Sequence, residues 1–315
     1  PNIVNELSFG TDRKVTSETV CPGGFTLFQH AENQVSLDAI RKGDWDYVVL
    51  QEQSQLPSID YYRHNAMRPA YQALYDTIIL YNPEAKVIGY MTWGRQYGGR
   101  QCEDYGDGIY CSADFVDFNH MQDTLSIAYC ENAYATESYV SPVGDAWKES
   151  LLQNENIALH SSDESHPNYY GSYLAACVFH AAFWNDTPIG TYHDSSYIDR
   201  RKAAYFQTIA HDVFFNNLEK WNFCSETDTT SINEIRSDNF EIINYPNNES
   251  IFIKNYKNTS ANIRIINIYG KIIAEKDTIN DEILYTNGSK GIFIILITEH
   301  DSQKRLVQKI IKTST

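Results

Sequence analysis

The chain has 315 residues, 42% of them hydrophobic, and a formal net charge of −16 at pH 7. This length suggests two domains, and the acidic charge argues against nucleic acid as a partner, because phosphate binding requires a basic surface. No apolar run approaches the ~20 residues that cross a bilayer, so we expect no membrane span.

Helix and strand patterns alternate along the first 222 residues. Residues 1–9 have helical spacing with no strand before them, which predicts an α/β domain whose first strand and following turn are missing. The clearest buried strand is 45–51 (WDYVVLQ), and 86–92 (KVIGYMT) is the next one. Further strands are expected at 14–21 and 138–143, an irregular loop at 93–112, and helices at 26–31, 36–42, 65–81, 114–132, 145–152, 169–184 and 196–218.

This alternation predicts a mostly parallel sheet covered by helices on both faces. In such sheets the ligand site lies at the carboxyl ends of the strands. The polar loops after residues 21, 51, 92 and 143, together with 161–167, should therefore gather at one edge of the sheet.

Asp163 and His166 are three residues apart in the last of these loops. Pro167 follows and suits the first position of the next helix, since its missing N–H would be unpaired there. A carboxylate beside an imidazole fixes the tautomer and stabilises the imidazolium, as in a general base. The alternative is a loop aspartate and an exposed histidine that merely cap the helix.

The six cysteines show none of the usual zinc spacings and no C-x-x-C pair, so we expect no metal site. Cys102 and Cys111 flank a glycine-rich loop and could form a disulfide in an exported protein. Free buried thiols are the alternative. The six are Cys21, Cys102, Cys111, Cys130, Cys177 and Cys224.

Residues 1 to about 222 resemble an SGNH-type (GDSL-like) serine hydrolase through three of that family's four sequence blocks. Pro22-Gly23-Gly24 resembles the second block, VVLQEQS the third, and Asp163-x-x-His166-Pro167 the fourth. The resemblance implies a flavodoxin-like three-layer α/β/α fold. It also implies that His166 is the base and that Asp163 orients it.

The oxyanion donors implied by the resemblance are the Gly24 N–H and the Gln53 amide. Gln51-Glu52-Gln53-Ser54 replaces the family's usual Gly-x-Asn-Asp, so Gln53 would offer the same donor on a longer arm. Gln51, Glu52 and Trp93 are candidate substrate-binding residues. Glu52 could instead bond to a backbone group, and Trp93 could simply pack its loop.

The first block of the family, which carries the nucleophilic serine, is absent. The resemblance places this serine upstream of Pro1, where the missing strand is also expected. We therefore expect a fragment that is inactive, or close to it, from an active parent protein. Ser54 is an alternative nucleophile, although a loop serine more often bonds to the backbone.

The composition changes near residues 227–231. The first 228 residues carry 14 basic and 31 acidic side chains, a net charge of −17, whereas the rest is nearly neutral. Short alternating segments separated by turns predict a small antiparallel β-sandwich. These segments are 240–244, 250–254, 261–268, 271–274, 282–285, 291–297 and 305–311, and we place the two domains at 1–226 and 232–315.

Residues 235–315 are similar to the C-terminal sorting domain of the bacterial type IX secretion system. The resemblance rests on Tyr245-Pro246-Asn247, IRIINIYGKII, GIFIILI and the closing Lys309-Ile310-Ile311-Lys312. It implies the type IX machinery as a partner and a Bacteroidetes-like secreted or cell-surface protein. The alternative is an immunoglobulin-like accessory or sugar-binding module.

Two functions remain open at this point. The leading one is a secreted serine esterase without metal or cofactor that hydrolyses acyl esters, acetyl esters of carbohydrates being the favoured class. The other is a non-catalytic carbohydrate-binding or adhesion protein on the same scaffold, with its aromatic loops as the functional surface.

Overall fold

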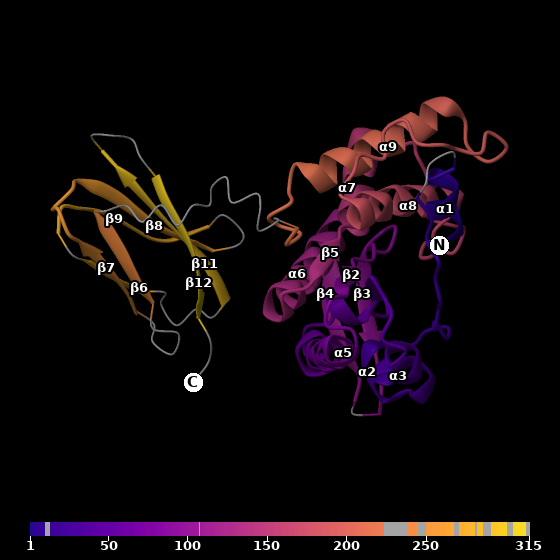
Figure 1. Cartoon of the computed structure of the whole chain (residues 1–315), viewed down its shortest axis with the longest axis horizontal. Coiled ribbons are helices and arrows are strands. Elements are labelled where there is room, and N and C mark those ends of the chain that lie inside the picture. The colour runs from indigo at the N-terminus through magenta and orange to yellow at the C-terminus, as the bar shows by residue number, and fades with distance from the viewer. Residues whose placement is uncertain are drawn as a thin grey trace. The chain divides into compact units, whose positions relative to one another are not determined.

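A computed structural model describes residues 1–9, 13–106, 108–223, 239–244, 250–267, 271–280, 282–285, 291–300 and 305–312. The chain divides into two compact units, Pro1–Cys224 and Ser225–Thr315, and each is described by itself (Figure 1). None of the helices in the described ranges is long and apolar enough to cross a membrane.

A parallel sheet forms the centre of the first unit. Its described strands are β1 (Tyr47–Leu50), β2 (Lys86–Tyr90) and β5 (Tyr139–Ser141), in the order β1-β2-β5. The parallel sheet predicted from the sequence is thus confirmed. The prediction that the strand at 45–51 is buried holds only in part, because Val49 of β1 is 40% exposed.

Helices surround this sheet, and most lie close to where the sequence predicted them (Figure 1). Asn168 caps α8, its side chain accepting from the Gly171 N–H at 3.1 Å, so Pro167 precedes the helix and is not its first residue. The helices are α1 (Asn2–Leu7), α2 (Leu27–Glu32), α3 (Gln34–Ile40), η1 (Leu56–Ser58), α4 (Asp60–Tyr62), η2 (Arg63–Met67), α5 (Arg68–Tyr81), α6 (Phe118–Thr136), α7 (Val143–Gln153), α8 (Tyr169–Trp184) and α9 (Arg200–Phe215).

The two faces of the sheet are covered by different helices. On one face, a Cβ at Gly89 would lie 3.0 Å from the Tyr71 hydroxyl of α5 and 3.3 Å from the Tyr129 ring of α6. On the other face, the Tyr90 ring packs edge-on against Phe179 of α8. Because successive strand residues point to opposite faces, the unit has the expected three layers of helix, sheet and helix.

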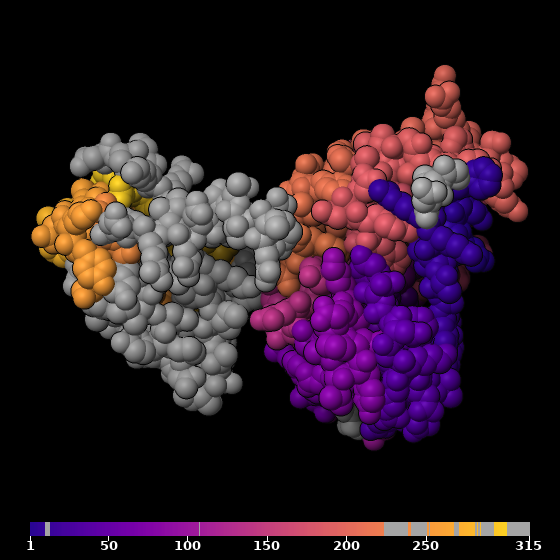
Figure 2. Space-filling model, in the orientation of Figure 1, coloured from indigo at the N-terminus to yellow at the C-terminus, as the bar shows by residue number. Residues whose placement is uncertain are grey.

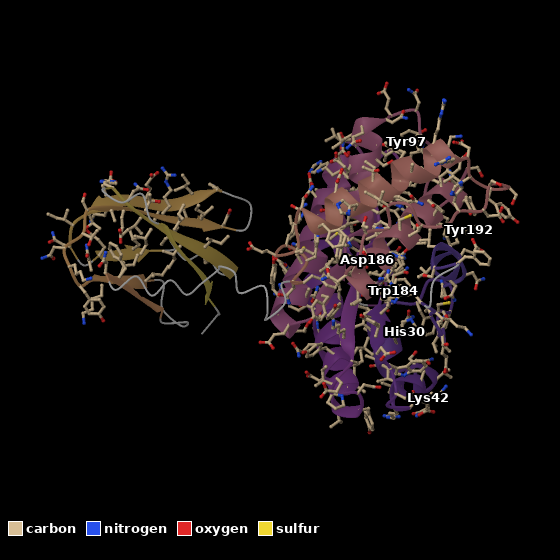
Figure 3. The ribbon with its side chains drawn as sticks, turned by 45° about the horizontal axis from the view of Figure 1, so that its top comes forward. His30, Lys42, Tyr97, Trp184, Asp186 and Tyr192 are labelled. Atoms are coloured by element: carbon tan, nitrogen blue, oxygen red, sulfur yellow. A yellow bond between two sulfur atoms is a disulfide. The ribbon has the colours of Figure 1, made fainter. Side chains whose placement is uncertain are left out.

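The predicted strand at 14–21 does not form. The backbone of Val15 is bonded to a side chain instead, since the Asn5 amide oxygen accepts from the Val15 N–H at 2.7 Å and the Asn5 nitrogen donates to its carbonyl at 2.9 Å. The extended chain is also held at the end of α8, where Arg13 pairs with Asp186 at 2.6 Å and lies over the Trp184 ring. Figure 3 labels Asp186 and Trp184, which lie close together there. Figure 2 shows the N-terminal residues, in indigo, against the salmon helices of the unit.

The expected irregular loop at 93–112 contains an antiparallel hairpin of β3 (Gly99–Glu103) and β4 (Tyr110–Phe115). Cys102 and Cys111 lie opposite each other in it and form a disulfide. Cys130 and Cys177 are free and buried, and Cys21 is free and exposed. Cys224 lies outside the described residues.

Gly171, in the first turn of α8, is packed too closely to carry a side chain. A Cβ there would lie 2.3 Å from the Trp147 ring and 2.6 Å from the Leu159 carbonyl oxygen. We expect Gly171→Ala to lower the free energy of unfolding by about 1–3 kcal/mol through overpacking, as measured by urea unfolding. Gly23→Ala is the control, since a Cβ at Gly23 meets no atom within 4 Å. Equal stability of the two variants would contradict the prediction.

The second unit is the predicted small antiparallel β-sandwich. One sheet has the order β10-β7-β6 and the other β12-β11-β8-β9. Ile251 and Ile253 from the first sheet share a buried core with Ile263, Ile265 and Ile295 from the second. The strands are β6 (Phe240–Asn244), β7 (Ser250–Asn255), β8 (Ala261–Asn267), β9 (Ile272–Thr278), β10 (Glu282–Tyr285), β11 (Gly291–Glu299) and β12 (Arg305–Lys312). The motif Tyr245-Pro246-Asn247 and the turn at Tyr269-Gly270 lie outside the described residues.

Candidate active site

The loop that carries Asp163 and His166 is closed by hydrogen bonds between its two ends. His160 and Pro167 form an isolated antiparallel bridge, and the Ser161 N–H donates to the His166 carbonyl at 2.7 Å. The Ser161 hydroxyl also donates to the Pro167 carbonyl at 2.9 Å. These bonds fix the loop that precedes α8 as a closed turn.

The Asp163 carboxylate bonds the His166 ring within this turn. Oδ2 accepts from Nδ1 at 2.6 Å, while Oδ1 accepts from the backbone N–H groups of Ser165 and His166. The His166 backbone N–H, its ring and the Ser165 N–H together lower the pKa of Asp163 to about 2. Because Nδ1–H donates to a carboxylate, Nε2 is the nitrogen of the neutral ring that can accept a proton. The His166 side chain is 78% exposed.

Residues that follow β2 hold this turn in place. The Trp93 indole N–H donates to the Ser165 carbonyl at 2.8 Å, and the Gln96 N–H donates to the Glu164 carbonyl at 3.0 Å. The Trp93 ring is half-buried and stacks on Trp147 with centroids 4.4 Å apart. From the sequence, Trp93 could be either a substrate contact or a residue that packs its loop, and these contacts fit the second role.

His160 adds another contact between the same two segments. Its Nε2 donates to the Gly94 carbonyl at 3.0 Å, and its ring packs edge-on against Trp147. Burial lowers the pKa of His160, which favours the neutral ring. Nothing in the sequence pattern around His160 indicated this role.

Glu52 does not fit the substrate-binding role predicted from the sequence. It is 0% exposed, and its Oε1 accepts from the Leu27 N–H at 3.0 Å and from the Gln53 N–H at 2.7 Å. Burial raises the pKa of Glu52 to about 8, although the two backbone donors oppose this. The side chain thus joins the start of α2 to the loop after β1, which matches the alternative of a backbone contact.

The predicted oxyanion donors lie in two different loops, Gly24 in the turn before α2 and Gln53 in the loop after β1. Gly24 is exposed and has a φ of +73°, which glycine adopts without strain. Gln53 is half-buried; its Oε1 accepts from the N–H groups of Gln55 and Leu56 at 2.8 and 3.2 Å. Gln51 is exposed at the end of β1, where it remains a candidate substrate contact.

The structure therefore joins the predicted residues in two groups. One contains Asp163, His166 and Trp93, and the other contains Glu52 and Gln53. No hydrogen bond between described residues links His166 directly to Gln53. Residues 93–101 bond the His166 turn through Trp93 and Gln96, and they reach the second group only through Gln55, which donates to Gln101.

Comparison with known proteins gives matches only among solved structures, since no family model and no curated protein matches the chain. A DUF4886 family protein from Bacteroides uniformis has a TM-score of 0.51 and 17% identity, covering 62% of this chain and 81% of its own. A protein described as a candidate SGNH hydrolase from Slackia heliotrinireducens has a TM-score of 0.39 and 22% identity, covering 50% and 79%. A mutant acetyl-xylooligosaccharide esterase from Geobacillus has a TM-score of 0.31 and 14% identity, covering 51% and 67%. The first match shows that this chain shares the α/β fold of the DUF4886 protein.

Proposed function

We propose that the protein is a serine esterase of the SGNH type whose nucleophile is a serine encoded upstream of Pro1. The observation that carries the proposal is the 2.6 Å bond between Asp163 and the exposed His166 ring. It leaves Nε2, which no described residue bonds, available as a general base.

The reaction follows from the roles of these groups. His166 Nε2 takes the proton of the serine hydroxyl while the serine oxygen attacks the ester carbonyl carbon. The backbone N–H of Gly24 and the side-chain amide of Gln53 stabilise the oxyanion, and His166 returns the proton to the leaving alcohol. Water then hydrolyses the acyl-enzyme by the same base catalysis, releasing the acid.

The free edge of β1 supports a further strand beside it. Among the described residues β1 pairs only with β2, and Val49 on β1 is 40% exposed. A strand that precedes Pro1 and pairs with β1 would cover this edge and bring its following turn to the carboxyl ends of the strands. That turn is where the nucleophile is needed.

For the substrate we propose acyl esters of carbohydrates, with acetyl esters as the first class to test. Aromatic side chains lie at both ends of the hairpin: the Tyr61 and Tyr110 rings stack 3.5 Å apart at one end, and Tyr97, 66% exposed, precedes β3 at the other. Flat aromatic surfaces with polar edges suit sugar rings. We further propose that the second unit directs export through the type IX secretion machinery, which would place the enzyme outside the cell or on its surface.

The test is p-nitrophenyl acetate hydrolysis by protein expressed with the residues encoded upstream of Pro1. We expect activity that is lost when the serine of the upstream Gly-x-Ser turn is replaced by alanine. Ser54→Ala is the matched control and should remain active. If Ser54→Ala abolishes hydrolysis and the upstream replacement does not, the assigned nucleophile is wrong. Binding of acetylated xylan without any hydrolysis would instead support a non-catalytic binding protein.

A further inference from the structure

We propose that Gln55 and Gln101 are positioning residues that orient the Gln53 amide, and that the disulfide-closed hairpin β3–β4 holds this chain of amides in place. The inference rests on the proposed function, because it concerns the oxyanion donor of that reaction. It adds two residues that do not touch the substrate and links them to the Cys102–Cys111 disulfide.

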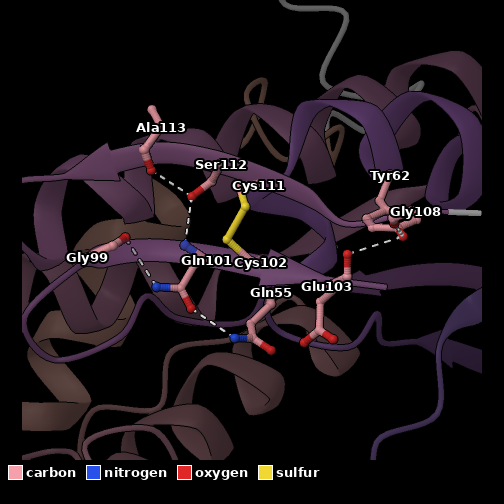
Figure 4. Close-up of a disulfide and its surroundings, with 10 residues drawn as sticks. All are labelled: Gln55, Tyr62, Gly99, Gln101, Cys102, Glu103, Gly108, Cys111, Ser112 and Ala113. Carbon is pink, nitrogen blue, oxygen red and sulfur yellow. Dashed lines mark hydrogen bonds between the residues drawn. A yellow bond between two sulfur atoms is a disulfide. The ribbon is translucent and has the colours of Figure 1, made fainter. Parts of the chain in front are cut away.

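The three glutamine side chains are bonded head to tail. Gln53 Nε2 donates to Gln55 Oε1 at 3.1 Å. Gln55 Nε2 in turn donates to Gln101 Oε1 at 3.0 Å (Figure 4). Every amide in the chain therefore donates in the same direction, away from Gln53 and toward the hairpin. Hydrogen bonds in such a chain polarise and strengthen one another.

Backbone groups fix the direction of this chain at both ends. Gln53 Oε1 accepts from two N–H groups, those of Gln55 and Leu56, so this atom must be the oxygen. Gln101 Nε2 donates to two carbonyls, those of Gly98 and Gly99, at 3.1 and 3.2 Å, so this atom must be the nitrogen. Neither terminal amide can be flipped without placing donor against donor or acceptor against acceptor.

The hairpin provides the anchor for Gln101. This residue is 6% exposed, and its N–H donates to the Ser112 hydroxyl across the two strands at 3.0 Å. The next residue, Cys102, is covalently bonded to Cys111 (Figure 4). The backbone on both sides of Gln101 is thus tied to β4.

The consequence concerns the second hydrogen of the Gln53 amide. One N–H is used by Gln55, and the other has no acceptor among the described residues and can serve the oxyanion. A glutamine has one more rotatable bond than the asparagine it replaces, so without restraint its amide would sample more positions. Preorganised donors stabilise an oxyanion because they need no reorientation during the reaction.

The test uses the protein expressed with the residues encoded upstream of Pro1, here called the upstream-extended protein. Its kcat and KM for p-nitrophenyl acetate are compared with those of its variants. Gln53→Ala should lower kcat by about 10²–10³-fold, the usual effect of removing one oxyanion donor. Gln101→Leu and Gln55→Leu should lower kcat by about tenfold with KM within about threefold, because the interaction is made in the transition state. Gln153→Leu, which removes an exposed glutamine bonded to Glu149, is the matched control and should leave both constants unchanged.

A double variant separates positioning from a general structural effect. On the Gln53→Ala background, Gln101→Leu should have no further effect on kcat, since the donor that it positions is already gone. Replacing Cys102 and Cys111 with serine should act like Gln101→Leu and should likewise lose its effect on that background. Equal losses with and without Gln53, or an unchanged kcat in Gln101→Leu, would overturn the inference.

The positioning of the Gln53 amide can also be tested separately from the proposed esterase function. If His166→Ala leaves hydrolysis unchanged, the proposed function is wrong, but the chain of amides can still be tested by NMR. Gln101→Leu should shift the side-chain ¹H–¹⁵N resonances of Gln53, whereas Gln153→Leu should not. Unshifted Gln53 resonances in Gln101→Leu would show that Gln101 does not position this amide.

Discussion

Replacing His166 with alanine is expected to lower the rate of p-nitrophenyl acetate hydrolysis by the upstream-extended protein about 10²–10⁴-fold. The reason is that the exposed ring, held by Asp163 at 2.6 Å, is the general base of the proposed reaction. His64→Ala is the matched control, because His64 also lies beside an aspartate, Asp60, at 3.4 Å but on a different part of the fold. Equal rates for the two variants would contradict the mechanism.

Asp163→Asn tests the orienting role within the same pair. The amide Oδ1 of the introduced asparagine can still accept from the backbone N–H groups of Ser165 and His166, so the turn should persist. Its Nδ2 would face His166 Nδ1, which also donates, and the ring would lose the acceptor that fixes its tautomer. We expect a loss approaching that of His166→Ala, with an unchanged far-ultraviolet circular dichroism spectrum. Full activity in this variant would remove Asp163 from the mechanism.

The second large effect is expected in the pH dependence of stability, and it comes from Glu52. Burial raises the pKa of this carboxyl from 4.5 to about 8 in the folded protein. Between these two values the folded state binds more protons than the unfolded state, so the free energy of unfolding falls as pH rises. The full loss, reached above about pH 8, is on the order of 5 kcal/mol.

Glu52→Gln isolates this contribution. A glutamine Oε1 can accept from the N–H groups of Leu27 and Gln53 as the neutral acid does, but it does not ionise. In urea unfolding we expect the variant to match the parent at pH 5 and to exceed its stability by several kcal/mol at pH 9. Glu84→Gln, at an exposed position, should follow the parent at both values. A constant difference between Glu52→Gln and the parent across this range would show that Glu52 is ionised throughout.

The sequence alone determined the elements whose pattern depends on local chemistry. The apolar run of α8 (Tyr169–Trp184) has the predicted bounds, and the alternating strands β6 (Phe240–Asn244) and β10 (Glu282–Tyr285) do as well. The spacing of Asp163 and His166 also identified the turn, because a three-residue separation lets one side chain bond both the backbone and the ring. In each case the contacts are formed within a few residues of one another.

Only the tertiary structure decided the features that depend on distant partners. The segment 14–21 alternates like a strand, yet the side chain of Asn5 takes the bonds of Val15. The hairpin β3–β4 was hidden in a glycine-rich stretch, since its stability comes from cross-strand pairing and the disulfide. The sequence around Glu52 is typical of a polar loop, but the Leu27 N–H at the start of α2 donates to its carboxyl group, and burial raises its pKa. Burial and the choice of hydrogen-bond partner are set by the packing of segments far apart in the chain, which no local pattern records.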